Sequence, residues 1–185
     1  GYGLAGSGDD AFPTGNDNDN SGILQYVRIE YAGYAYQPDN ELNSLTMAGV
    51  GRGTTISHIQ VTYAKDDAFE WFGGTVNCKY IIAYKTQDDD FDSDLGYSGK
   101  VQFGIVLRDS AIADISRSEA FESDNDGSGT NALPYTAPVF SNITVVGPYR
   151  GATTNTIDAK FRRALRLRRN TYTSVFNSIF TEHAR

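Results

Sequence analysis

Carboxylates recur in three short segments of the chain that can be aligned with one another. The segments are residues 65–71 (KDDAFEW), 87–93 (QDDDFDS) and 117–123 (RSEAFES). Each centres on a phenylalanine that is followed by an acid and preceded, two residues earlier, by another acid. Oxygen-rich groups of this kind suit a hard cation such as Ca²⁺, or paired acid and base catalysis, if the fold brings the segments together.

The spacing of the segments indicates how the fold would do so. The first two copies are 22 residues apart and the third follows after 30, a period typical of repeat architectures. Short segments with strand-like alternation, separated by Gly, Asn, Asp and Thr, occur at residues 26–29, 58–61, 80–83, 103–106, 142–145 and 177–180. In a parallel β-helix, like residues of successive coils stack about 4.8 Å apart, whereas an antiparallel sandwich needs no such repetition.

We therefore expect one all-β domain, a parallel β-helix (solenoid) of about six coils. The longer intervals between strands are expected to form loops at one edge. These predicted loops are residues 34–52, 124–138 and 147–161, which are rich in Gly, Asn, Thr and Pro.

Side chains alternate along a strand, so inward phenylalanines imply outward acids beside them. With Phe69, Phe91 and Phe121 inward, the acid after each of them points outward, and the same alternation places Asp88 and Asp90 outward. The predicted cation site comprises Glu70, Asp88, Asp90, Asp92 and Glu122, with Ca²⁺ as the expected ion. The alternative is a solvated acidic face that keeps the rod soluble and blocks edge association.

Two loops resemble the first half of a calcium-binding loop, with oxygens at alternate positions and a Gly turn. They are residues 17–22 and 124–129. They add Asp17, Asp19, Asp124 and Asp126 as weaker metal candidates. The bidentate Glu expected at the twelfth position is Arg28 in one case and Tyr135 in the other, and Asx turns at coil corners explain both loops equally well.

Aromatic residues beside the acids suggest a sugar-binding platform. Trp71 and Phe72 directly follow Glu70, and with Asp66 they form the predicted ligand site; the alternative is that Trp71 caps a coil corner next to Gly73. His58 occupies the place that tyrosines take in other coils, so we expect a stacked wall residue rather than a catalytic base. No catalytic residue is assigned.

Charge and cysteine content narrow the partners. The net charge is −7, which argues against nucleic acid and anionic lipid as ligands. Residues 150–185 nevertheless carry eight bases and two acids, and Arg166 and Arg168 predict a strand with one basic face that pairs with a neighbouring acidic face. Cys78 is the only cysteine, which excludes an internal disulfide and favours a buried thiol. No apolar run reaches the roughly 18 residues of a membrane span.

Residues 19–33, 67–77, 87–92 and 168–170 resemble a family of large secreted or surface proteins of Bacteroidota, which is similar to the right-handed parallel β-helix, or pectate-lyase-like, superfamily. The resemblance implies a right-handed helix, an extracellular or outer-membrane-surface location, and a domain over 1–185 that is a piece of a longer protein. β-Helix polysaccharide lyases hold Ca²⁺ with acidic side chains from stacked strands. The resemblance implies no activity for this chain.

We expect a non-catalytic extracellular scaffold or adhesion module that contacts a polysaccharide or a surface protein with the help of Ca²⁺. Two alternatives remain open. One is a polysaccharide lyase or glycoside hydrolase that uses the acidic ladder, since Asp66-Asp67 and Asp88-Asp89 resemble the Asp-Asp pair of polygalacturonase-like enzymes. That family's Gly-His-Gly and Arg-x-Lys elements are missing here. The other is a purely structural rod in a larger surface assembly.

Overall fold

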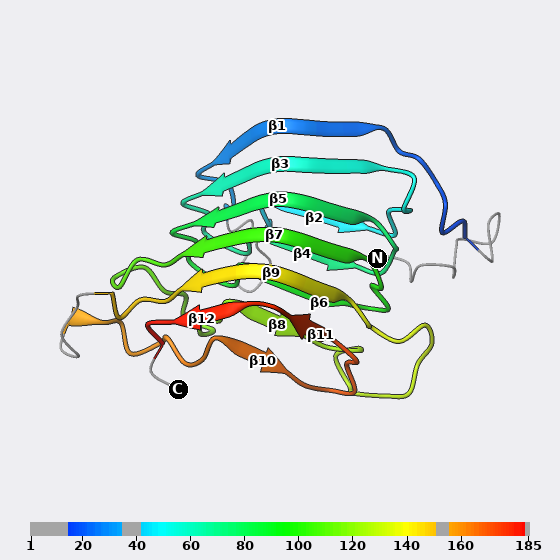
Figure 1. The fold of residues 1–185 in the computed structure, drawn as a ribbon. Helices are drawn as coiled ribbons and strands as arrows, with labels where there is room; N and C mark the ends of the chain where they lie inside the picture. The colour runs from blue at the N-terminus through cyan, green and yellow to red at the C-terminus, as the bar shows by residue number, and fades with distance from the viewer. Residues whose placement is uncertain (1–14, 35–41, 151–155, 184–185) are drawn as a thin grey trace.

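The chain winds into stacked coils built from two parallel sheets (Figure 1). The structure is a computed structural model that describes residues 15–34, 42–150 and 156–183. The long-strand sheet contains β1 (Ile23–Glu30), β3 (Thr55–Thr62), β5 (Asn77–Tyr84), β7 (Lys100–Leu107), β9 (Val139–Val146), β11 (Ser174–Phe176) and β12 (Ile179–Thr181). The short-strand sheet contains β2 (Leu45–Ala48), β4 (Phe69–Phe72), β6 (Phe91–Asp94), β8 (Phe121–Ser123) and β10 (Leu165–Leu167).

The pairing confirms the predicted all-β fold of parallel, in-register coils. Phe69 pairs with Phe91 and Phe91 with Phe121, as the sequence overlay requires. The arrangement is consistent with a right-handed parallel β-helix, and the described residues contain no α-helix. No helix in the described part of the chain is long and apolar enough to cross a membrane. The predicted loop 34–52 was wrong in part, because it contains the strand β2.

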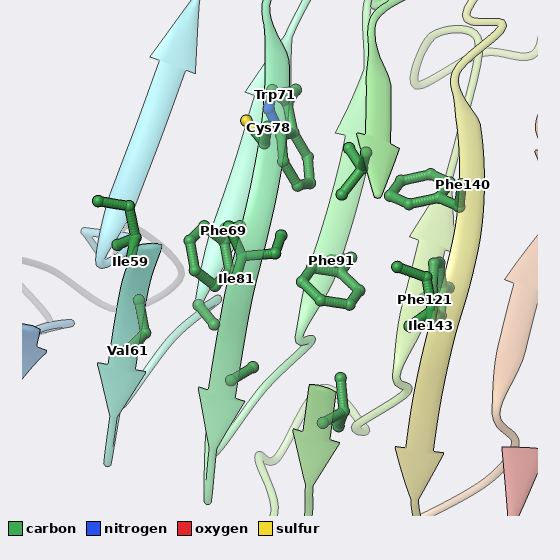
Figure 2. Close-up of a cluster of buried hydrophobic side chains, with 14 of the residues drawn as sticks. Ile59, Val61, Phe69, Trp71, Cys78, Ile81, Phe91, Phe121, Phe140 and Ile143 are labelled. Carbon is green, nitrogen blue, oxygen red and sulfur yellow. The ribbon is translucent and has the colours of Figure 1, made fainter. Parts of the chain in front are cut away.

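The core fills the space between the two sheets (Figure 2). Phe69, Phe91 and Phe121 of the short strands are buried, and so are the apolar side chains of the long strands. The buried long-strand residues include Ile59, Val61, Ile81, Val106, Phe140, Ile143 and Val145. In-register stacking therefore places apolar side chains of successive coils in the same column. Each side chain is buried by contacts with the coils directly next to it.

Gly104 makes room for the phenylalanine column. It lies in register between Ile81 and Ile143, where the neighbouring coils have isoleucines. A Cβ at Gly104 would lie 2.8 Å from Ile143 Cδ1 and 3.4 Å from Phe91 Cζ. The missing side chain thus leaves the space that the Phe91 ring and the Ile143 side chain share.

In each coil, the chain bends within the long-strand sheet at one residue whose φ is positive, in the left-handed region. The six residues have φ between 44° and 63° and are Tyr26, His58, Tyr80, Phe103, Asn142 and Asn177. Pairing of β1 with β3 passes from Gln25–Ser57 directly to Val27–Ile59, so the left-handed residues stand outside the ladder. They form a column along the helix axis, at the bend of every rung.

We expect Phe91→Ala to destabilise the fold by about 3–5 kcal/mol, because it leaves a cavity that rigid coils cannot close. Phe91 is fully buried and packs against Phe69, Phe121 and Phe140. Urea denaturation measures the change. Phe91→Leu is the control and should cost about half as much or less, since more of the volume is retained. Equal losses for the two variants would contradict this packing.

Candidate functional site

Acidic side chains form two columns along the short-strand sheet. In the first, Glu70 aligns with Asp92 and Asp92 with Glu122 across β4, β6 and β8. The second column precedes the strands and contains Asp67, Asp89 and Glu119, which are 7%, 5% and 1% exposed. The sequence overlay contained this second column, but alternation alone assigned it no role.

The second column is tied to the backbone of the next coil. The Asp89 amide donates to Asp67 Oδ1 at 2.9 Å, and the Glu119 amide donates to Asp89 Oδ1 at 2.6 Å. Asp67 and Asp89 thereby each satisfy an N–H group just before the following short strand. These carboxylates hold successive coils in register as well as contributing negative charge.

Stacking brings the two columns together in clusters whose carboxylate oxygens lie within 4.8 Å of one another. We name two of them. The Glu70 cluster is Asp67, Glu70 and Asp92, and the Glu119 cluster is Asp89, Glu119 and Glu122. A further group of Asp66, Asp67 and Asp88 adjoins the Glu70 cluster through Asp67.

Glu70 itself has no protein counter-charge among the described residues. Glu70 is 7% exposed and forms no hydrogen bond or ion pair with another residue of the described ranges. Burial, followed by the charge of Asp92, raises the pKa of Glu70 to about 10. Burial and neighbouring acids also raise the pKa values of Asp67 and Asp92. Such a cluster either keeps protons at neutral pH or exchanges them for a cation.

The protein's own arginines neutralise Glu122, in the other cluster, and the neighbouring Asp124. Arg166 pairs in register with Glu122, and its Nη1 lies 2.6 Å from Glu122 Oε2. Arg168 also pairs with Glu122, and its Nε lies 2.8 Å from Asp124 Oδ1. The predicted pairing of a basic strand face with an acidic face is confirmed. Glu122 is therefore a weaker metal candidate than Glu70.

The predicted outward orientation of Asp90 was wrong. Asp90 is fully buried, and its Oδ2 lies 2.7 Å from Nε of the buried Arg108. Residues 88–90 precede β6 in a bend, so strand alternation does not apply to them. Asp88 remains partly exposed beside the Glu70 cluster, accepts a hydrogen bond from the Ser116 hydroxyl at 3.0 Å, and has a pKa raised to about 7 by burial and by Asp114.

Arg108 is a key residue that sequence reasoning missed. Its Nη1 donates to the carbonyl oxygens of Asp88 at 2.6 Å and Thr86 at 3.3 Å, and its Nη2 donates to the carbonyl of Glu119. The guanidinium thus joins two coils from inside. An arginine directly after an apolar strand carries no repeat signal, because Lys85 follows the neighbouring strand β5 and Gly147 follows β9.

The predicted aromatic platform does not form at Trp71. Trp71 is fully buried, stacks on Tyr97 at 5.2 Å between ring centroids and contacts Phe69, so it is a core residue. Phe72, the next residue, is half-buried. Asp66 has a carboxylate oxygen within 4.8 Å of those of Asp67 and Asp88, which keeps it beside the acidic site.

The two calcium-like loops use their acids within the protein. Asp19 accepts the Ser21 hydroxyl at 2.9 Å, and Asp17 lies 3.4 Å from Arg52. Asp126 accepts the amide of Ser128 at 2.8 Å, the geometry of an Asx turn. Asp124, in the same loop, is held by the arginines described above. In the first loop the Asn18 and Gly22 amides donate to Asn16 Oδ1 and Asn20 Oδ1, so Asx turns explain both loops.

An aromatic ladder crosses the opposite sheet, at the left-handed bends. Ring centroids are 4.5 Å apart for Tyr26 and His58, 4.6 Å for His58 and Tyr80, and 5.0 Å for Tyr80 and Phe103. The expectation that His58 is a stacked wall residue is confirmed. A groove of about 620 Å³ runs beside the ladder over β1, β3, β5, β7 and β9. Cys78 is buried, and burial raises its pKa to about 12, as expected for a structural thiol.

Comparison with known proteins identifies the fold but no activity. A family model described as "Pectate-lyase like beta helix domain" matches residues 3–185, nearly the whole chain. No curated protein and no solved structure matches the chain.

We expect Arg108→Met to destabilise the protein by about 3–5 kcal/mol, because it leaves the buried carboxylate of Asp90 without a partner. The double variant Arg108→Met with Asp90→Asn should recover part of this loss, since the uncompensated charge is gone. Thermal and urea unfolding of the two variants measure the difference. A double variant less stable than the single one would contradict the ion pair as the main contribution of Arg108.

Proposed function

The chain belongs to the pectate-lyase-like β-helix domain family, and from this premise we propose that it is a non-catalytic extracellular scaffold stabilised by Ca²⁺. In this proposal the ion binds at the Glu70 cluster, and the outer faces of the helix contact a glycan or a surface protein. The single observation that carries the proposal is the buried Glu70 carboxylate, which has acids on its neighbouring coil and no partner of its own among the described residues.

The donor set fits Ca²⁺ better than a transition metal. Asp67, Glu70 and Asp92 provide oxygen ligands only, and Asp66 and Asp88 add carboxylates at the adjoining group. Ca²⁺ takes six to eight oxygens in flexible geometry, whereas Zn²⁺ prefers nitrogen and sulfur. When bound, the ion would supply positive charge between β4 and β6, where no described arginine or lysine pairs with Glu70.

The surroundings favour a scaffold over an enzyme. His58 is stacked in the ladder of the opposite sheet, and His183 lies just after β12, where burial lowers its pKa to about 4. Arg108 is buried against Asp90 and backbone carbonyls rather than presented to a substrate. Among the described residues, no histidine, lysine or arginine forms an ion pair with Glu70.

The secreted or surface location is part of the same proposal. Its support is the family's β-helix fold, the acidic composition, and the millimolar Ca²⁺ affinities that suffice for extracellular modules.

We expect Ca²⁺ to raise the melting temperature of the protein, and Glu70→Gln to abolish that rise. At about 100 times the dissociation constant, a single bound ion adds about 2.7 kcal/mol. Calorimetric titration and thermal unfolding with Ca²⁺ and with chelator provide the measurements. Glu30→Gln is the matched control, an exposed acid in β1 far from the cluster in the fold. Binding that survives Glu70→Gln would disprove this site.

We also expect the stability of the Ca²⁺-free protein to fall as the pH rises from about 5 to about 10. Glu70 has a raised folded-state pKa, so the folded protein holds a proton that the unfolded chain has lost above its ordinary pKa. Each such proton costs up to about 1.4 kcal/mol per pH unit. Because Ca²⁺ replaces these protons, its stabilising effect should grow with pH. Glu70→Gln, which imitates the protonated side chain, should flatten the profile in chelator; an unchanged slope would contradict the assignment.

A further inference from the structure

The groove beside the aromatic ladder is a second surface with a distinct chemistry. The ladder consists of Tyr26, His58, Tyr80 and Phe103, and the floor of the groove is the backbone of the residues that follow them. The far wall consists of Arg28, Gln60, Ile82, Ile105 and Thr144, which are two residues beyond the bend in each rung. The groove therefore runs along the helix axis and crosses five strands.

The residue types at the bend are costly for the backbone. Left-handed φ is easily adopted by Gly and tolerated by Asn, but costs other residues about 1–2 kcal/mol. The same column ends in Asn142 and Asn177, so the fold accepts asparagine at this position. Four coils use a tyrosine, a histidine or a phenylalanine instead, and Tyr26, Tyr80 and Phe103 leave 77%, 47% and 39% of their surface exposed. Strained residues that expose aromatic surface and together line a groove, as these do, point to a functional surface.

The charge of the groove selects a neutral ligand. In a chain of net charge −7, the groove lining contains one formal charge, Arg28, and Glu30 neutralises it. An anionic polymer would meet an acidic body without a basic patch in this groove. A cationic one would find its counter-charges on the opposite sheet, at the acidic clusters.

The geometry selects a linear, hydroxyl-bearing ligand. The ladder repeats every 4.5–5.0 Å along the helix axis, so a straight polymer chain can lie beside one ring after another. The stacked rings line the groove, and Tyr26, Tyr80 and His58 bring hydroxyl groups and ring nitrogens that are able to hydrogen-bond to a hydroxyl-bearing ligand. An extended peptide is less suitable, because the backbone N–H and C=O groups of these inner strands already pair between coils.

We propose that this groove binds a neutral, extended polysaccharide, with its chain along the helix axis and successive sugar units beside successive rings. Sugar hydroxyls would bond to the tyrosine hydroxyls and to polar groups such as Gln60, while the C–H faces would lie on Ile82 and Ile105 of the far wall. The inference rests on the proposed scaffold role, since it names the ligand of one outer face, but it does not depend on the Ca²⁺ site.

The test is titration calorimetry with cellohexaose, a straight neutral glycan, in chelator so that the acidic clusters take no part. Isomaltohexaose, neutral but flexible, and hexagalacturonate, straight but anionic, are the ligand controls. We expect the first to bind and the two controls to bind at least about tenfold more weakly, or about 1.4 kcal/mol. Absence of cellohexaose binding at its solubility limit would overturn the proposal and leave the Ca²⁺ predictions intact.

The test variants are Tyr80→Asn and Phe103→Asn, because asparagine already occupies this column at Asn142. Each should weaken cellohexaose binding about tenfold while the fold, followed by circular dichroism, stays intact. Tyr31→Asn is the matched control: Tyr31 is also left-handed and 69% exposed, but lies outside the groove. Equal weakening by Tyr31→Asn would contradict the groove as the binding site.

Sedimentation of the same samples tests a competing occupant. If the face is instead an interface between two copies of the chain, the protein will be dimeric and Tyr80→Asn will make it monomeric. That result would overturn the glycan assignment. A monomer in both cases, together with loss of glycan binding in the variant, supports it.

Discussion

The whole structure depends on stacking coils directly on one another, so that each residue lies over its counterpart about 4.8 Å away. Side chains of the same kind therefore lie directly against one another in each column. Apolar columns gain from it, as the buried Phe69, Phe91 and Phe121 demonstrate. Carboxylate columns suffer from it, because like charges meet at the closest spacing that the backbone allows. The protein's chemistry arises where repetition is unfavourable and something else must compensate.

The acidic columns are compensated differently along the axis. At the C-terminal end, β10 replaces the acid by Arg166, which pairs with Glu122 and leaves no need for another cation. In the middle, Asp67 and Asp89 each accept a backbone amide of the next coil, which converts part of the repulsion into inter-coil hydrogen bonds. Glu70 has neither form of compensation. Burial of that one carboxylate turns a general acidic face into a specific candidate site.

The two sheets carry surfaces of different chemistry. The short-strand sheet concentrates negative charge, and the buried Arg108 ties its coils together from inside through Asp90 and three backbone carbonyls. The bends of the long-strand sheet carry a nearly uncharged aromatic ladder above a groove. A rigid solenoid places these surfaces on opposite sides of one core.

Repetition is visible in a sequence, and this explains what could be predicted. The Phe–acid overlay determined the parallel fold, the register of Phe69, Phe91 and Phe121, and the in-register alignment of the acids beside them, since a repeat states which residues stack. It could not determine the direction of Asp90, the burial of Trp71 or the partner of Arg108. Those depend on bends between strands, where alternation fails and each coil differs from the next. Only the tertiary structure decided which acids the arginines neutralise, as at Glu122, and which, such as Glu70, have no ion pair among the described residues.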